Sequence, residues 1–283
     1  GMNPVLNNIN PYHGSIWAAV EALANYVSVG GDYRQASLIN NYIWPFPDSE
    51  SLWALDRSVD AVVEVMKVFG IPVISGKDSL SSTYRGKDGK VLKIPPVLCM
   101  SVFGRIPHVE KTISSDFKNI GSHIFLVGRQ DLQGMGGSIY LNDRVRGDRV
   151  PLLALKKTKQ VFDVMYEGIQ AAVISSSHDI SEGGLITTVF EMSVGGNCGV
   201  NIVIPQNKRA DLFLFNETAG CFVIEVKDRG AGDKLLKSIP HQYLGVTTQK
   251  KQISFSHDSK ELFQIKLSEL KDAWQKPFKK LFV

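Results

Sequence analysis

Apolar residues recur at helical spacing in five stretches of the chain. The clearest is Ser51–Phe69, where apolar side chains return every three or four residues and Gly70 stands where helices commonly end. Similar periodicity, with an alanine-rich composition in the first case, predicts further helices over residues 15–27, 157–175, 184–194 and 267–282. The residues just before the first of these helices, 10–14, are turn formers and predict a turn.

Short apolar or alternating runs, bounded by glycine, proline and polar clusters, predict strands over residues 36–39, 71–74, 96–104, 122–128, 199–204 and 221–226. Residues 85–90 predict a hairpin tip. The polar stretch 111–118 predicts a linker, so we expect one domain over residues 1–119 and a second over residues 120–283. Helices and strands interleave throughout, which predicts layered α+β domains.

Net charge, the length of apolar runs and the spacing of cysteines exclude several classes of protein. The net charge of +4 is too small to indicate a nucleic-acid partner. No apolar run approaches the roughly 20 residues of a membrane span, and no signal peptide is recognisable. The cysteines, Cys99, Cys198 and Cys221, are far apart and form neither a zinc pattern nor a disulfide framework, so we expect a cytoplasmic protein. Gly1-Met2 resembles a tag remnant before a start codon, so we expect a piece of a longer protein.

One polar stretch, Ser177–Leu185, carries the densest candidate chemistry. It places Asp179 and Ser181 just before the pair Gly183-Gly184, between two helical patterns. Free N–H groups at a helix start attract anions, and the Asp179 carboxylate could hold a cation beside them. An ordinary helix cap explains the same residues, and by spacing alone it is the more common explanation.

Glu21 and Asn25 are a second candidate pair. They lie four residues apart on the predicted helix 15–27, so their oxygen-bearing side chains share one face. Hard cations such as Mg²⁺ take oxygen ligands. A solvated helix face with one side-chain hydrogen bond is the simpler alternative.

The stretch Gly76-Lys77-Asp78-Ser79 follows the predicted strand 71–74. A glycine, a cation, a carboxylate and a hydroxyl at a strand end are typical of a phosphate or metal loop. The glycine spacing of a Walker motif is not present, and an ordinary polar turn also explains these residues.

A glycine-rich loop follows the predicted strand 122–128. It contains Gly134, Gly136, Gly137 and Ser138, whose backbone N–H groups could approach an anion closely. Glycine loops are common, so this motif is weak when it is considered by itself.

The order of these motifs is more specific than any one of them. Five stretches in sequence resemble phosphoribosylformylglycinamidine synthase, a purine-biosynthesis enzyme that converts formylglycinamide ribonucleotide to formylglycinamidine ribonucleotide with ATP and glutamine-derived ammonia. They are Glu21–Asn25, Ser75–Ser79, Gly134–Ser138, His178–Gly184 and Leu214–Glu217. The resemblance covers nearly the whole chain, and His-Asp-x-Ser-x-Gly-Gly followed by Phe-Asn-Glu is its most specific part.

The synthase region of this family is an internal duplication, and the chain resembles its second half. The resemblance implies an AIR synthetase-like α+β fold: a ferredoxin-like N-terminal αβ domain truncated at its start, then a C-terminal α/β domain with a mixed sheet. The first half, which carries the catalytic histidine of the family, and a glutaminase domain or subunit would be partners. The resemblance therefore assigns no catalytic residue here, and we expect the isolated chain to be inactive.

The resemblance also implies a nucleotide site. Glu21, Asn25 and Asp179 match magnesium positions, and Ser181 matches a nucleotide contact. In the large form of the family, the second-half site holds ATP or ADP as a structural element rather than as a substrate.

A further group matches positions that the second half contributes to the active site across a pseudo-twofold interface. Asn40 and Gly76 would contact ATP there, and Ser79 the ribonucleotide substrate. Asn40 replaces an aspartate of the small form, and Lys77 replaces an asparagine metal ligand. A lysine ammonium cannot bind Mg²⁺, so Lys77 would contact a phosphate. We assign phosphate contacts to the glycine-rich loop as well, at Gly134, Gly136, Gly137 and Ser138.

Two alternative functions remain at this point. The chain could be a non-catalytic, nucleotide-binding structural module. It could also be another ATPase of the superfamily, such as the hydrogenase-maturation dehydratase, which has a similar Asp-x-Thr-x-Gly-Gly stretch but works through a C-terminal cysteine. This chain ends in Lys280-Leu281-Phe282-Val283, which counts against the dehydratase. A truncated first domain would leave a sheet edge uncovered, which suggests a homodimer. No membrane or nucleic-acid partner is expected.

Overall fold

The computed structural model describes residues 1–141, 149–279 and 281. The eight helices in these residues are α1 (Pro4–Ile9), α2 (Pro11–Ser28), α3 (Ser49–Phe69), α4 (Leu155–Gln170), α5 (Gly184–Gly196), α6 (Ala210–Phe215), α7 (Arg229–Leu236) and α8 (Leu267–Lys279). The last helix is predicted to end at residue 282, which lies outside the described residues. None of the helices just named is both long and apolar enough to cross a membrane.

Twelve strands in the same residues form three sheets. They are β1 (Ala36–Ile43), β2 (Val73–Ser79), β3 (Thr83–Arg85), β4 (Val91–Lys93), β5 (Val97–Gly104), β6 (His123–Val127), β7 (Ile174–Asp179), β8 (Gly199–Ile204), β9 (Phe222–Val226), β10 (His241–Thr248), β11 (Gln252–His257) and β12 (Lys260–Lys266). A three-stranded sheet has the order β2-β1-β5, and a seven-stranded sheet the order β12-β11-β8-β10-β6-β9-β7. Strands β3 and β4 form the predicted hairpin. This combination of helices and mixed sheets confirms the predicted α+β class.

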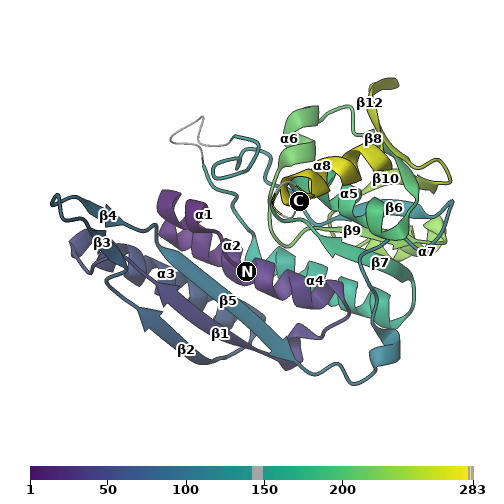
Figure 1. Cartoon of the computed structure of the whole chain (residues 1–283). Coiled ribbons are helices and arrows are strands. Elements are labelled where there is room, and N and C mark those ends of the chain that lie inside the picture. Colours follow the sequence, from purple (N-terminus) through teal and green to yellow (C-terminus); the bar gives the residue numbers. More distant parts are fainter. Residues whose placement is uncertain (142–148, 280, 282–283) are drawn as a thin grey trace.

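The three-stranded sheet is covered on one face by α2 and α3 (Figure 1). Strand β1 pairs in parallel with β2 and antiparallel with β5. Its alternate side chains Leu38 and Tyr42 are buried against the helices, as the two-residue period of a strand requires. On the outer edge of β5, Gly1 and Met100 exchange two backbone hydrogen bonds of 2.8 and 2.9 Å. The first residue of the chain therefore extends this sheet.

The central strands β6 and β9 of the seven-stranded sheet are buried on both faces. Strand β9 shows this directly, because every one of its five residues is buried. Phe222 and Ile224 pack into the cluster that contains α4 and α7, whereas Val223 packs into the cluster that contains α5, α6 and the start of α8. Phe117, in the predicted linker 111–118, also packs here as a member of the second cluster. A domain boundary between residues 119 and 120 stays a prediction.

Helix α2 connects the two sheets. It packs against α3 and β5 on one side and against α4 and β7 on the other. Trp17 near its middle is fully buried, and its indole N–H donates to the backbone carbonyl of Glu217 at 2.7 Å. One hydrophobic cluster consequently extends from the first sheet to one face of the second.

Three local predictions were wrong. Residues 10–14 are not a turn: Asn10 caps α2 by accepting the His13 N–H at 3.0 Å, and Pro11 is compatible with a first helical turn. The helix predicted over 157–175 ends at Gln170, and β7 follows it. The stretch Ser177–Leu185 therefore starts on a strand rather than between two helices.

The third error concerns the expected loop at Gly76–Ser79. These residues belong to β2, where parallel pairing with residues 40–43 of β1 continues the strand through Ser79. The backbone pairing compensates for the low strand propensity of a Gly-Lys-Asp-Ser sequence. Correspondingly, β1 runs to Ile43, beyond the four residues predicted for it.

Candidate functional site

The start of α5 follows the carboxyl end of β7. His178 and Asp179 are the last residues of that strand, and Ser181 lies in the turn after it. Gly183 and Gly184 both have positive φ, +83° and +71°. A Cβ on Gly184 would lie only 2.7 to 2.9 Å from backbone atoms of residues 214–216 at the end of α6. Only glycine permits both this backbone conformation and this close approach.

Glu217 joins the start of α5 to the glycine-rich loop. One carboxylate oxygen, Oε1, accepts the N–H of Gly183 at 2.8 Å and the N–H of Ile139 at 2.9 Å. The side chain is buried, and burial raises its pKa to about 7 against the lowering effect of these two bonds, with a further raising contribution from Glu182. The carboxylate is therefore a buried bridge between two segments that are distant in sequence.

Asn216 holds the other end of the same loop. Its Nδ2 donates to the carbonyl of Asp131 at 2.8 Å and to that of Gly134 at 3.3 Å. Its Oδ1 accepts the hydroxyl of Thr218 at 2.5 Å. The Phe-Asn-Glu motif thus fixes the loop that precedes it and the helix start that follows β7. This explains physically why these motifs occur together.

Most backbone N–H groups of the glycine-rich loop already have hydrogen-bond partners. The N–H groups of Gly134, Gly136 and Ser138 already donate to backbone carbonyls at 2.8, 3.0 and 3.1 Å. Gly137 has a φ of +78° and lies against Leu6 of the unpredicted helix α1. A phosphate contact by this loop stays a prediction, and three of its four N–H donors would first have to leave their present partners.

Glu21 faces the end of β7, because α2 packs against that strand. Burial raises the pKa of Glu21, and the nearby charges of Asp179 and Glu182 raise it further, against the lowering effect of the N-terminal ammonium and the Met2 N–H. The Met2 N–H donates to Glu21 Oε2 at 2.9 Å. The fold therefore brings together two of the three predicted metal residues.

The chemistry of this donor set fits a cation. Carboxylates that repel one another are stabilised by a positive ion between them, and Mg²⁺ commonly binds one or two carboxylates plus waters and phosphates. Asn25 lies one turn from Glu21, and its Nδ2 donates to the Glu21 carbonyl at 3.1 Å, which leaves its amide oxygen available. In residues 1–141, 149–279 and 281, no three His, Cys, Asp or Glu side chains form a metal-binding group by themselves. A cation here would accordingly need further ligands from water or a nucleotide.

His178 is a site residue that the sequence reasoning missed. Its Nδ1 lies 3.4 Å from the Asp179 carboxylate, and its Nε2 lies 3.1 Å from Glu191 on α5. Burial alone lowers the pKa of His178, but these acidic partners outweigh burial and raise the pKa to about 10. The imidazolium therefore anchors the end of β7 to α5. His178 and Glu191 are 13 residues apart, and this spacing produces no periodic pattern in the sequence.

The second predicted group lies on the β1–β2 pair. Asn40 is aligned with Gly76, and a Cβ on Gly76 would lie 1.7 Å from Asn40 Oδ1. The side chains of Lys77 and Ser79 are hydrogen-bonded to each other on the exposed strand β2. These four residues thus form a group of their own on the first sheet. The described structure contains no hydrogen bond or ion pair between this group and the Glu21–Asp179 group.

Residues 119–258 match the family described as AIR synthase related protein, C-terminal domain. These residues, just under half of the chain, are therefore similar to the AIR synthase-related proteins.

Within that class, the chain is related to phosphoribosylformylglycinamidine synthase. It is 28% identical to the PurL subunit of that enzyme from Deinococcus radiodurans over 98% of this chain and 38% of the relative. It is 31% identical to the PurL subunit from Caldanaerobacter subterraneus over 94% of this chain and 36% of the relative. The chain therefore spans less than two fifths of the length of these curated relatives.

Solved structures show the same fold. PurLQS from Thermotoga maritima superposes with a TM-score of 0.73 at 13% identity, over 94% of this chain and 42% of that one. The T. maritima PurL complex with FGAR gives a TM-score of 0.72, also at 13% identity, over 93% and 44% of the two chains. The hydrogenase maturation protein HypE of Escherichia coli gives 0.70 at 15% identity, over 94% and 83%. At these identities the likeness concerns the fold alone.

Proposed function

We propose that this chain is the second half of the synthase region of a phosphoribosylformylglycinamidine synthase. The whole enzyme would carry out ATP-dependent amidation of formylglycinamide ribonucleotide. Relatives of 28% and 31% identity are PurL subunits, and a T. maritima PurL has been solved with ATP. The first half of the synthase and a glutaminase that supplies ammonia would be its partners.

Within this chain, we assign a structural nucleotide site to the end of β7. Glu21, Asn25 and Asp179 would hold Mg²⁺, and Ser181 would contact the nucleotide. The convergence of Glu21 and Asp179 carries this assignment: the two carboxylates are close enough for the charge of Asp179 to raise the pKa of Glu21. The bound nucleotide would supply phosphate oxygens as further metal ligands. The role of these residues is to bind and to orient, with no proton transfer assigned to them.

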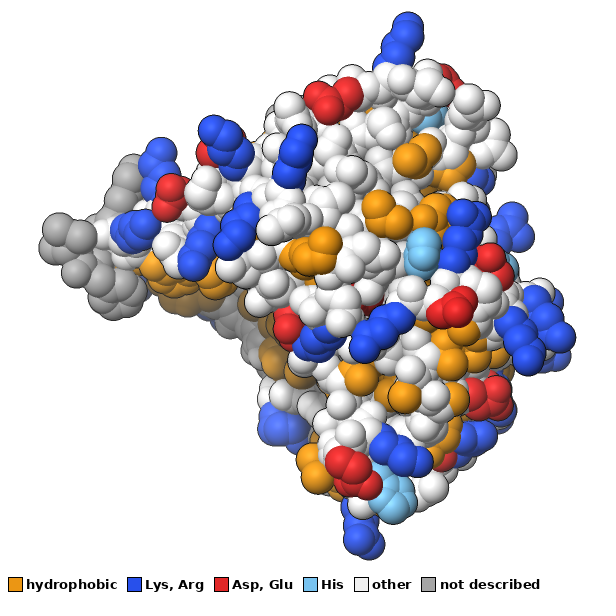
Figure 2. Space-filling view, turned by 90° about the vertical axis from the view of Figure 1, so that its right-hand side faces the viewer, with side chains coloured by type: hydrophobic (Ala, Val, Ile, Leu, Met, Phe, Trp, Pro, Cys, Tyr) orange, Lys and Arg blue, Asp and Glu red, His pale blue; other side chains and the backbone are white. Residues whose placement is uncertain are grey.

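The group on the first sheet has a different role in this proposal. Asn40, Gly76 and Ser79 would complete the active site of the other synthase half, and Lys77 would contact a phosphate there. Gly76 and Lys77 are exposed on β2, and Asn40 and Ser79 are partly exposed, so these residues are accessible to a partner. Lys and Arg side chains are dispersed over the face shown in Figure 2, with acidic side chains among them. This face therefore presents no continuous basic surface of the kind that binds nucleic acid.

Calorimetry with ADP, with and without Mg²⁺, tests the nucleotide site. We expect saturable binding that requires Mg²⁺ and is lost in Asp179→Asn. Asp228→Asn is a suitable control, because Asp228 only caps α7. Binding of equal affinity in both variants would reject the site.

An ammonia-dependent assay of the purified chain tests its dependence on the other half. The proposal expects no turnover. Measurable formation of the amidine product would show that this chain has an active site of its own.

A further inference from the structure

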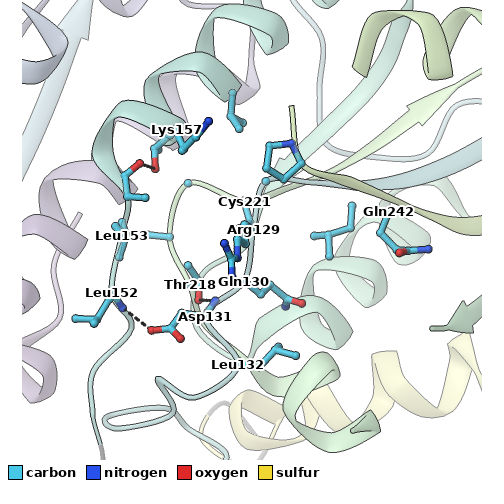
Figure 3. A pocket seen from close by; sticks show the side chains of 18 of the residues that line it. Arg129, Gln130, Asp131, Leu132, Leu152, Leu153, Lys157, Thr218, Cys221 and Gln242 are labelled. Carbon is cyan, nitrogen blue, oxygen red and sulfur yellow. Dashed lines mark hydrogen bonds between the residues drawn. The ribbon is translucent and has the colours of Figure 1, made fainter. Parts of the chain in front are cut away.

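A cavity of about 730 Å³ lies at the ends of strands β6, β9 and β10 of the second sheet (Figure 3). It is bounded by the loop after β6, the first turn of α4, residues 218–221 before β9 and the start of β10. Its volume is typical of pockets that hold a small organic ligand. None of the residues assigned above to the nucleotide or its metal contributes to the wall.

The wall carries an excess of positive charge. Arg129, Lys157 and Lys208 reach it from three separate segments, and none of them is in an ion pair or a side-chain hydrogen bond within the described residues. The other arginine in the wall, Arg149, is neutralised by Asp131 through two contacts of 2.6 and 2.8 Å. Three cations are thus available to an incoming anion.

Most of the neutral polar side chains of the wall already have hydrogen-bond partners. Gln130 donates to the Phe213 carbonyl at 3.1 Å, and Gln242 donates to the Tyr243 carbonyl at 3.0 Å. The Thr218 hydroxyl bonds to Asn216 and accepts the Asp131 N–H. Recognition in this cavity therefore falls to the cations. Figure 3 shows Lys157 and Gln242 on opposite sides, with Arg129 between them.

The first turn of α4 adds to the positive potential. This helix has 16 residues, and no side chain caps its N-terminus. Its partial positive charge is directed toward the same region as Lys157, which lies in that first turn. Leu132, Leu152 and Pro240 provide apolar wall for the organic part of a ligand. Cations from several directions suit the compact, multiply charged head of a phosphate monoester better than a single carboxylate.

We propose that this cavity is a second binding site, which takes a phosphorylated small molecule of the size of a sugar phosphate or a mononucleotide. The assignment does not depend on the proposed nucleotide site. It requires no metal ion, because the protein supplies the positive charge.

Calorimetric titration of the whole chain with ribose 5-phosphate, in buffer with a chelator, tests the site. Ribose is the uncharged control ligand. We expect saturable binding of the phosphate ester, weakened at least tenfold in Lys157→Gln and further in the double variant with Arg129→Gln. Lys156→Gln is the matched control, since this neighbouring exposed lysine does not line the cavity and should leave the affinity unchanged.

A second titration with AMP identifies the organic part. Tighter binding of AMP than of ribose 5-phosphate indicates a mononucleotide, whereas equal binding indicates that only the sugar phosphate is recognised. Both titrations are made in the buffer with chelator, which removes the Mg²⁺ that the nucleotide site requires and so separates the two sites. The proposal is overturned if neither phosphate ester binds, if ribose binds equally well, or if Lys157→Gln and Lys156→Gln have the same affinity.

Discussion

The carboxylate of Glu217 accepts the backbone N–H of Gly183 at 2.8 Å, across 34 residues of sequence. The same oxygen accepts the N–H of Ile139. These two hydrogen bonds connect the turn before α5 to the glycine-rich loop, two segments that are distant in sequence. A single buried side chain therefore contacts both segments.

Replacing that side chain should be costly. Glu217→Ala leaves two N–H groups without an acceptor, and we expect a loss of about 2–4 kcal/mol in the free energy of unfolding. Glu217→Gln keeps an oxygen acceptor and should lose less than half as much. Urea unfolding at pH 7 measures both. Equal losses in the two variants would show that the pair of N–H bonds contributes little.

The raised pKa of Glu217 predicts a pH dependence. Because burial raises the pKa from 4.5 to about 7, the folded state binds this proton more tightly than the unfolded state does. The stability associated with the protonated form is present below pH 4.5 and is lost as the pH rises to about 7. The loss should be on the order of 2–3 kcal/mol.

Unfolding curves between pH 4 and 8 measure this loss. The comparison is with Glu217→Gln, which cannot titrate and should lack this component. An identical pH profile in the two proteins would contradict the shift.

His178 should make the free energy of unfolding depend on pH in a higher range than Glu217 does. Its pKa is raised from 6.5 to about 10, so its stabilising contribution is complete below pH 6.5 and is lost as the pH rises through 10. Because Glu191 is half exposed, solvent screens part of this interaction, and we expect an effect on the order of 1–2 kcal/mol.

The measurement is the free energy of unfolding from pH 6 to 10 in metal-free buffer. His178→Gln should flatten the profile. His108→Gln, at an exposed histidine beside Glu110, should not. A slope that survives in His178→Gln would assign it to other groups.

The close approach of α5 to the end of α6 gives a steric prediction. Gly184→Ala should destabilise the fold by about 3 kcal/mol or more, because the methyl group would lie within 2.9 Å of backbone atoms and φ is +71°. Gly70→Ala is the matched control, since its φ is +73° but its methyl group would meet nothing within 4 Å. It should cost about 1 kcal/mol. Thermal or urea unfolding of both variants separates contact from backbone strain, and equal costs would refute the contact.

Local sequence predicted much of the helical framework. Helix α3 was recognised because its apolar stripe is regular and Gly70 ends it in the left-handed conformation, with a φ of 73°. Strand β7 was missed, since its polar residues Ser176 and Ser177 are buried by the tertiary structure. Strand β2 was missed beyond residue 74 because its pairing with β1 is a non-local property.

The candidate site shows the same limit. Motif order identified Asp179 and Glu217 as members of one family pattern. The contact of Glu217 with Gly183 and the approach of Glu21 to Asp179, where α2 lies against β7, both follow from packing between segments that are distant in sequence. The ion pair of His178 with Glu191 likewise depends on how α5 folds back, which no local pattern specifies.

The burial of Trp17 between the two sheets has a consequence for how the chain folds. The indole N–H of Trp17 donates to the Glu217 carbonyl, 200 residues away, and one hydrophobic cluster contains residues of both sheets. Each sheet region therefore needs the other to bury its apolar side chains. The two regions should therefore melt as one cooperative unit, even though their sheets are separate. Fragments cut at residue 119 should each be unstable by themselves and recover native structure only when they are mixed, as a pair of complementing fragments.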